Sequence, residues 1–301
     1  MSYHEPVMLQ ETLEGLQLQP QGTYVDLTFG GGGHSQAILD RLGEGGRLFG
    51  FDQDDDARQQ ATKITDPRFR FVETNFRHLK RYLKLFGVTA VDGILADLGV
   101  SSHQLNEASR GFSTRFDADL DMRMDRGSSL TASEIVNTYP ERELHKILGM
   151  YGEIKNARSL AAAIVASRIK APIRTVAEFK EVLNRFAPRG KEFKYQAQVF
   201  QALRIVVNDE LKALEEMLEQ TVEVLKPGGR LVIMSYHSLE DRLVKSFMAK
   251  GKFSGEVEKD FWGNMQRPLA PVTRKPIEPS AEEVVQNNRA RSARLRIAEK
   301  I

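Results

Sequence analysis

The chain has 301 residues, of which 41% are hydrophobic and 28% are charged, and it contains no cysteine. This length and balance favour one large or two ordinary folded domains over a disordered chain. The lack of cysteine excludes disulfides, thiolate metal sites and mechanisms that need a thiol nucleophile.

The first hundred residues alternate short apolar runs with amphipathic stretches, a pattern that predicts strand–helix units around a parallel sheet. The four strands expected there are residues 24–29, 47–52, 69–75 and 91–98, with helices at 34–42 and 76–86. The alternation then stops, and the helices expected next are residues 132–136, 141–148, 160–168 and 176–186. It resumes with a helix at 210–225, a Lys-Pro-Gly-Gly turn, a strand at 230–236, a helix at 238–248 and a last strand within 290–298.

This order predicts an α/β fold in which a helical domain interrupts a doubly wound sheet. The sheet domain is expected to comprise residues 1–104 and 208–301, and the helical insertion residues 105–207. The insertion carries a local basic surplus, because residues 155–194 hold ten Lys or Arg and three Asp or Glu. Such a surplus suits contacts with nucleic-acid phosphates, although solvated helix faces explain part of it.

Three features fall where the predicted strands end. Four glycines, residues 30–33, follow the first strand and open a helix, which lets the backbone approach a ligand closely. Asp52 ends the second strand, where a carboxylate can accept hydrogen bonds from ribose hydroxyls, and Asp97 ends the fourth. A tight strand–helix turn would also explain the glycines. The dinucleotide fingerprint is incomplete, because its third glycine falls on Ser35 or Gln36, which disfavours a nicotinamide cofactor.

Six segments, in order along nearly the whole chain, resemble the ribosomal small subunit methyltransferase H (MraW) family. They are residues 28–35 (TFGGGGHS), 96–102 (ADLGVSS), 110–113 with 120–125, 200–205, 235–242 (SYHSLEDR) and 288–294. The resemblance implies a class I, Rossmann-like methyltransferase that uses S-adenosylmethionine to methylate N4 of a cytidine in the decoding region of 16S rRNA. By position it implies cofactor contacts at Gly32, Gly33, His34, Asp52, Phe76, Asp97 and Gln104.

The atom that accepts the methyl group, and the residues that contact it, are less well determined by the sequence. Without cysteine, the methyl acceptor should be nitrogen or oxygen, because methylation at a pyrimidine C5 normally needs a thiol adduct. Asp97 is followed by Leu-Gly-Val and lacks the Pro-Pro-aromatic sequence that often completes an amino-methylating site. We therefore expect Asp97 or a nearby backbone carbonyl to accept a hydrogen bond from the amino group, and Phe112 or Tyr236 to stack on the base. His237 is a further candidate for substrate contact, and Ser238 with the acids after it is typical of a helix start.

No metal is expected, because the aspartates of residues 117–125 alternate with arginines. The basic residues expected to contact RNA are Arg168, Arg189, Lys191, Arg289 and Arg291. The partner implied is 16S rRNA within the small ribosomal subunit. The sequence has no signal-peptide pattern and no apolar run long enough to span a membrane, so the expected location is the cytoplasm. It makes no prediction about oligomeric state.

Three other functions remain open at this stage. A nicotinamide-dependent oxidoreductase would use the same glycine loop with Asp52. An RNA-binding ribosome-assembly factor could keep the methyltransferase fold without catalysis. A methyltransferase of small molecules would leave the basic insertion unexplained.

Overall fold

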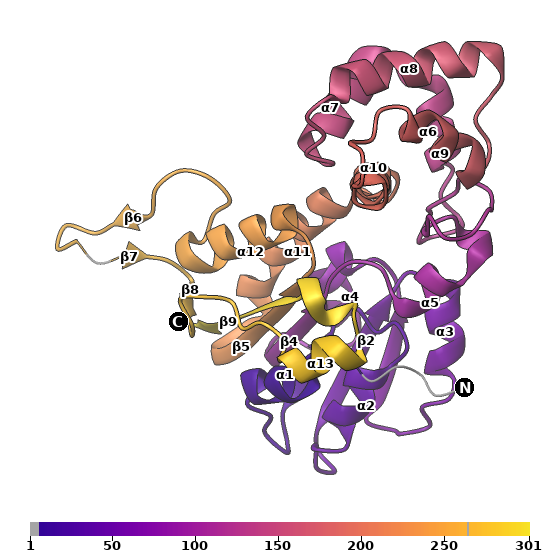
Figure 1. Cartoon of the computed structure of the whole chain (residues 1–301). Coiled ribbons are helices and arrows are strands. Elements are labelled where there is room, and N and C mark those ends of the chain that lie inside the picture. The colour runs from indigo at the N-terminus through magenta and orange to yellow at the C-terminus, as the bar shows by residue number, and fades with distance from the viewer. Residues whose placement is uncertain (1–5, 264) are drawn as a thin grey trace. The chain divides into compact units, whose positions relative to one another are not determined.

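The computed structural model describes residues 6–263 and 265–301, and the chain divides into two compact units (Figure 1). The first unit comprises the chain up to Gly99 together with Leu211–Ile301, and the second is Val100–Glu210. The expected insertion, residues 105–207, lies inside the second unit. In the described part of the chain, no helix is both long and apolar enough to cross a bilayer.

The first unit is built on a seven-stranded sheet with the strand order β3-β2-β1-β4-β5-β9-β8. The first five strands in this order are parallel to one another, and β9 and β8 add to the β5 edge in antiparallel pairs. The strands are β1 (Thr23–Asp26), β2 (Arg47–Asp52), β3 (Phe69–Glu73), β4 (Val91–Asp97), β5 (Leu225–Ser235), β8 (Leu269–Pro271) and β9 (Arg294–Lys300). The predicted α/β sheet is confirmed. The strand order changes direction at β1 and β4, which is where ligands bind in open parallel sheets.

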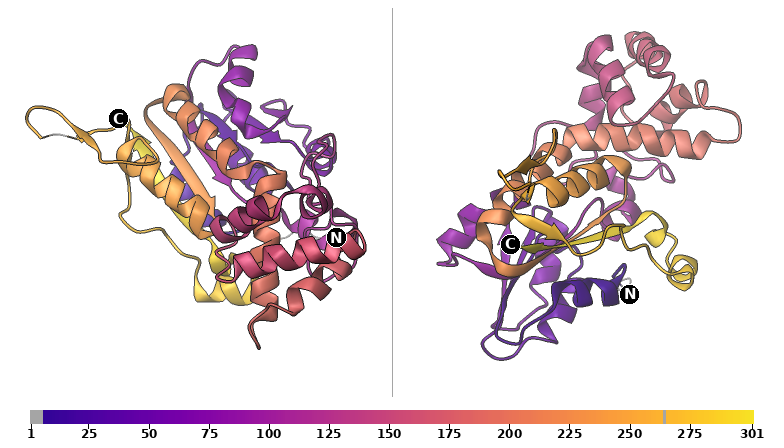
Figure 2. Two further views of the ribbon diagram at one scale, coloured as in Figure 1. Left: turned by 90° about the horizontal axis from the view of Figure 1, so that it is seen from above. Right: turned by 90° about the vertical axis from the view of Figure 1, so that its left-hand side faces the viewer.

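Helices cover both faces of this sheet (Figures 1 and 2). They are α1 (Leu9–Leu16), α2 (Gly33–Leu39), α3 (Asp55–Ala61), α4 (Leu79–Leu85), α11 (Glu210–Val224), α12 (Ser238–Lys250) and α13 (Ala281–Gln286), with the 3₁₀ turns η1 (Phe76–His78) and η3 (Ala290–Ser292). Successive residues of β4 face opposite cores: Ile94 packs with α4 and α11, and Leu95 with α1 and α2. Both faces are buried, so these strands are apolar at nearly every position.

The start of β5 differs from the prediction. The strand begins at Leu225, not at residue 230, and the Lys-Pro-Gly-Gly segment interrupts its pairing with β4. The register jumps from Val91↔Leu225 to Gly93↔Arg230, so these residues bulge from the ladder instead of forming a separate turn. The short pair β6 (Glu258–Lys259) and β7 (Met265–Gln266) was also not predicted.

The second unit is helical. Its elements are α5 (Ser102–Asn106), η2 (Ala108–Arg110), α6 (Ala132–Thr138), α7 (Glu141–Met150), α8 (Ala157–Lys170), α9 (Val176–Asn184) and α10 (Glu192–Val207). Helix α10 was not predicted, although it is the longest helix of this unit. Its Tyr195, Val199 and Leu203 enter the core at helical spacing. The nearly continuous apolar run at residues 202–207 hides that spacing in the sequence.

A buried ion pair joins α12 to β9 in the first unit. Asp241 accepts hydrogen bonds from Arg296 Nε at 2.6 Å and Nη2 at 3.1 Å, and each side chain is only 10% exposed. Arg294 donates to the same carboxylate at 3.2 Å. These arginines hold the pKa of Asp241 below its usual value against the opposing effect of burial.

We expect Asp241→Ala to lower the free energy of unfolding by about 3–5 kcal/mol, because it leaves the positive charge of the Arg296 guanidinium buried without its carboxylate partner. Urea denaturation followed by circular dichroism measures this loss. The double variant Asp241→Ala/Arg296→Met is the control and should recover much of it, since neither charge is then buried. A loss below about 1 kcal/mol in the single variant would mean that water reaches Arg296.

Candidate active site at the strand ends

Three carboxylates occupy the carboxyl ends of neighbouring strands in the first unit. Asp26 ends β1, Asp52 ends β2 and Asp97 ends β4. Strand β1 pairs with both β2 and β4 in parallel, so the three ends lie along one edge of the sheet. Asp52 and Asp97 were predicted, whereas Asp26 was not.

Asp52 ties the glycine loop to the second strand. Its Oδ2 accepts from the backbone N–H of Gly30 at 2.8 Å, and its Oδ1 from that of Asp54 at 2.9 Å. A carboxylate offers about four acceptor positions, so both oxygens keep capacity for further donors. Burial raises the pKa of Asp52 to about 6, and the two backbone hydrogen bonds limit the rise.

The glycine loop is shaped first by backbone geometry. Gly30 and Gly32 have φ values of 52° and 80°, the left-handed region that favours glycine. A Cβ on Gly32 would lie 2.8 Å from the Phe29 ring, and one on Gly33 would lie 2.5 Å from Pro6. The left-handed turn accounts for Gly30 and Gly32, and the close approach of Pro6 accounts for Gly33, so no ligand is needed to explain these three glycines. The loop passes beside Asp52, so a ribose hydroxyl bound by that carboxylate would have bare backbone beside it.

Asp26 supports the same loop from within the core. It is 1% exposed, and its Oδ2 accepts from the Ser35 hydroxyl at 2.7 Å while its Oδ1 accepts from the backbone N–H of Thr28 at 3.1 Å. Burial raises its pKa. The sequence did contain a signal for Asp26. It is an acid within an apolar strand, and Thr28 and Ser35, two and nine positions later, can donate hydrogen bonds to it.

Asp97 lies among polar groups from other segments of the first unit. Its Oδ1 accepts from the Tyr236 hydroxyl at 2.8 Å, and its backbone N–H donates to Thr28 Oγ1 at 2.6 Å. His34 Nδ1 lies 4.0 Å from Oδ2, and His34 Nε2 lies 3.1 Å from the carbonyl oxygen of Val7. Burial raises the pKa of Asp97 to about 6 against the lowering effects of His34 and Tyr236. Its side chain is 24% exposed, so an incoming donor can reach it.

The two aromatic candidates for base stacking are placed differently. The Tyr236 hydroxyl donates a hydrogen bond to Asp97. The Tyr236 ring lies close to Gly99, because a Cβ added to Gly99 would be 3.5 Å from Tyr236 Cδ2. Phe112 belongs to the second unit, where it is 7% exposed and packs in the core. Stacking by either ring stays a prediction.

Two other predicted cofactor residues lie in different units. Phe76 opens η1 in the first unit and is half-buried against the core. Gln104 belongs to α5 of the second unit, where its Oε1 accepts from the backbone N–H of Ser101 at 2.9 Å in a capping box.

The five basic residues expected to contact RNA also differ in their surroundings. Arg168 is partly buried, and its Nη1 donates to the carbonyl oxygens of Val136 and Tyr139 at 2.9 and 2.7 Å. The other four are exposed Arg189 and Lys191 before α10, half-buried Arg289, and exposed Arg291 in η3. In the aspartate-rich segment, Asp121 pairs with Arg123 at 2.7 Å, as the alternation of charges suggested.

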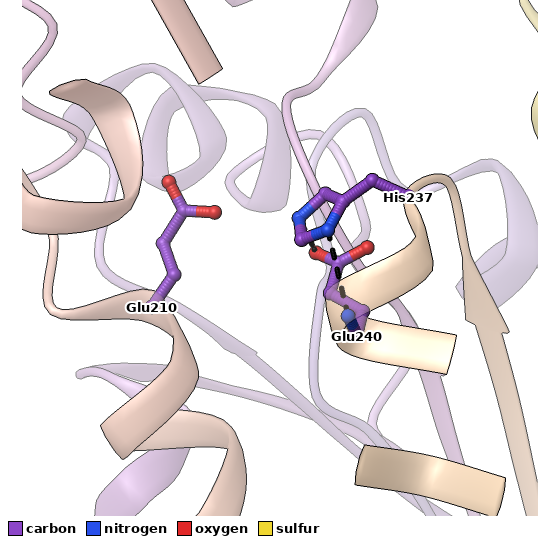
Figure 3. Close-up of side chains that lie close together, drawn as sticks. All are labelled: Glu210, His237 and Glu240. Carbon is purple, nitrogen blue, oxygen red and sulfur yellow. Dashed lines mark hydrogen bonds and ion pairs between the residues drawn. The ribbon is translucent and has the colours of Figure 1, made fainter. Parts of the chain in front are cut away.

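His237 and Glu240 form a pair at the start of α12, as Figure 3 shows. The backbone N–H of Glu240 donates to His237 Nδ1 at 3.4 Å, so His237 caps the helix. Glu240 is 3% exposed, and its Oε2 accepts from the backbone N–H of Tyr236 at 3.1 Å.

Comparison with known proteins shows the family to which the chain belongs. The family model described as the MraW methylase family matches residues 1–301. The chain belongs to this family. Relatives named ribosomal RNA small subunit methyltransferase H include one from Cytophaga hutchinsonii, which is 59% identical over 99% of each chain. Another, from Flavobacterium johnsoniae, is 55% identical over 100% of this chain and 99% of its own.

Membership of the MraW methylase family confirms the resemblance found in the motifs and favours a methyltransferase over an oxidoreductase. This is a family of S-adenosylmethionine-dependent methyltransferases, and the predicted cofactor is confirmed. The surroundings of Asp52 fit that cofactor, since a buried carboxylate with spare acceptor positions beside a glycine loop suits the ribose of an adenosyl group.

A pH dependence of cofactor binding follows from the raised pKa of Asp52. Its carboxylate form is the better acceptor for hydroxyl groups, and with a pKa of about 6 that form becomes scarce as the pH falls from 7 to 5. We expect the Kd for S-adenosylmethionine to rise about tenfold over this interval, measured by titration calorimetry. Asp52→Asn is the control and should remove this component of the dependence. A flat profile in the native protein would show that ionisation of Asp52 does not matter for binding.

The same raised pKa gives the stability of the cofactor-free protein the opposite dependence on pH. Because the folded-state pKa lies above the unfolded value, the stability contributed by protonated Asp52 is complete below about pH 4 and is lost as the pH rises through about 6. Because the cofactor is expected to bind more tightly at pH 7, it should raise the melting temperature more at pH 7 than at pH 5.

Proposed function

We propose that this protein transfers the methyl group of S-adenosylmethionine to N4 of a cytidine in the decoding region of 16S rRNA. The observation that carries the proposal is that two carboxylates end strands at the same edge of the sheet. Asp52 ends β2 beside the glycine loop, and Asp97 ends β4 on the other side of β1. The names of the relatives support small-subunit rRNA as the substrate class. The choice of N4 comes from the family resemblance.

Two of the residues that would hold the cofactor follow from their places in the first unit, at the end of β2 and at the start of η1. Asp52 would accept hydrogen bonds from the ribose hydroxyls, and Phe76 would lie against the adenine. By the family resemblance, Gly32, Gly33, His34, Asp97 and Gln104 complete the set. S-adenosylmethionine supplies a methyl group made electrophilic by its sulfonium. No metal is required for this transfer.

Asp97 is our candidate for the acceptor of the amino hydrogen. A cytosine amino group is a weak nucleophile because its lone pair is delocalised into the ring. A carboxylate that accepts one N–H hydrogen bond localises the lone pair and orients it, and a pKa near 6 makes Asp97 a stronger base than an ordinary aspartate. Holding the nitrogen, methyl carbon and sulfur in line can contribute a further 7–11 kcal/mol or so to lowering the barrier.

Exposed basic side chains would hold the RNA backbone. Arg189 and Lys191 in the second unit and Arg291 in the first are exposed and suited to phosphate contacts. Arg168 is a weaker candidate, since one of its amino groups already donates to two backbone carbonyls. Bases are modified only when they leave the stack, so the target should be single-stranded or extruded. A substrate of this kind implies that the protein acts in the cytoplasm on small ribosomal subunits.

Mass spectrometry of nucleosides tests the proposal. Purified protein, S-adenosylmethionine and small subunits that lack the modification should yield N4-methylcytidine at one position. Heat-treated protein is the control. Methylation at C5 or on a ribose would refute the proposed acceptor. Binding of the RNA with no transfer in a single turnover would support the assembly-factor alternative.

A further inference from the structure

The imidazole of His237 has a buried nitrogen, Nε2, that makes no hydrogen bond to the described residues. The side chain is 9% exposed. Glu240 Oε1 lies 3.2 Å from Nε2, an ion-pair contact that Figure 3 marks with a dashed line. This contact does not have hydrogen-bond geometry. A buried polar group without a partner is costly, so it is expected to gain one when the protein binds its substrate.

The other ring nitrogen settles what kind of partner this can be. His237 Nδ1 accepts from the backbone N–H of Glu240, and a neutral imidazole that accepts at Nδ1 carries its proton on Nε2. The neighbouring Glu240 carboxylate also favours a proton at that position. Nε2 is therefore a donor, and the contact with Glu240 Oε1 does not complete a hydrogen bond to it.

This donor lies at the same sheet edge as Asp97. Strands β4 and β5 are neighbours with Asp97 in register with Met234, and His237 follows β5 by two residues. Tyr236, the residue before His237, donates its hydroxyl to Asp97. The charge of Glu240 is close enough to contribute to the raised pKa of Asp97. A hydrogen-bond acceptor and a hydrogen-bond donor thus come from adjacent strands.

A cytosine presents the complementary pair of groups. Its amino group at C4 is a donor, and the adjacent ring nitrogen N3 is an acceptor, whereas uracil has the two reversed. We propose that His237 Nε2–H donates to N3 of the target cytosine while Asp97 accepts from its amino group. His237 is then a residue that selects the base, and Glu240 is a positioning residue that holds its ring. This inference rests on the proposed function.

The test combines one variant with one altered substrate. His237→Asn keeps a side chain that caps α12 well but removes the Nε2 donor. The substrates are small subunits reconstituted with 16S rRNA that carries cytidine or 3-deazacytidine, which lacks the N3 acceptor, at the methylated position. Single-turnover rates are measured for each of the four combinations, with the melting temperature and the Kd for S-adenosylmethionine of each protein.

We expect the native protein to methylate the deaza substrate about 10- to 100-fold more slowly than cytidine. His237→Asn should lose a similar factor on cytidine and almost nothing more on the deaza substrate, with an unchanged melting temperature and cofactor Kd. Glu240→Gln should reduce the preference for N3 in part, which a merely structural role would leave intact.

Two results would overturn the inference. One is a native protein indifferent to the loss of N3. The other is a His237→Asn variant that discriminates between the substrates as strongly as the native protein does. Neither result would affect the proposed function, which fails separately if the native protein does not methylate cytidine at all.

Discussion

Replacing Asp52 by alanine should weaken the binding of S-adenosylmethionine by about 100-fold or more. Each charge-assisted hydrogen bond from a ribose hydroxyl to a buried carboxylate contributes about 1.5–3 kcal/mol, and the adenosyl group offers two such hydroxyls. In the native protein, Asp52 also accepts hydrogen bonds from the backbone N–H groups of Gly30 and Asp54, and the substitution removes both. The glycine loop should therefore lose part of its order as well.

Titration calorimetry measures this loss, and Asp55→Ala is the matched control. Asp55 is an aspartate three positions away at the start of α3, and its side chain is 51% exposed. It should bind the cofactor like the native protein. An Asp52→Ala variant that keeps native affinity would refute the assignment of the ribose site.

The second large effect is expected at Asp97. Asp97→Asn keeps an oxygen that can accept from the Tyr236 hydroxyl, but its amide cannot take a proton from the amino group. We expect the single-turnover rate of methyl transfer to fall about 10²- to 10⁴-fold, the range typical of a lost general base. The Kd for S-adenosylmethionine should change far less than in Asp52→Ala.

Asp92→Asn is the control for this experiment, because it places the same substitution at the opposite end of β4. Asp92 there accepts from the backbone N–H of Thr23 and pairs with Lys226. Its variant should transfer methyl groups at the native rate. An Asp97→Asn variant that binds the cofactor and reacts at the native rate would show that Asp97 takes no part in the chemistry.

The sequence predicted the parts of the fold that local pattern determines. Strands buried on both faces appear as apolar runs, so β1 to β4 were placed within a few residues. Helix α10 was missed because its apolar stretch has no clear period, and the start of β5 was misplaced because Lys-Pro-Gly-Gly suggests a turn. In the sheet, these residues instead form a bulge between paired strands. Only the pairing partner reveals that.

For the site, the sequence indicated residues but not their partners. Asp52 and Asp97 were expected at strand ends, because acids that follow apolar runs stand out. Their hydrogen bonds to Gly30 and Tyr236 join segments that are distant along the chain, so no local pattern predicts them. Tyr236 illustrates the difference: it was proposed to stack on the base, and the structure shows its hydroxyl bound to Asp97.

Calorimetric titration of the purified protein with S-adenosylmethionine, run beside an identical titration with NAD, tests the central claim most directly. The site around Asp52 predicts that one methyl donor binds per chain and that the dinucleotide gives no heat of binding. A titration in which S-adenosylmethionine does not bind, or in which NAD binds in its place, would contradict the account.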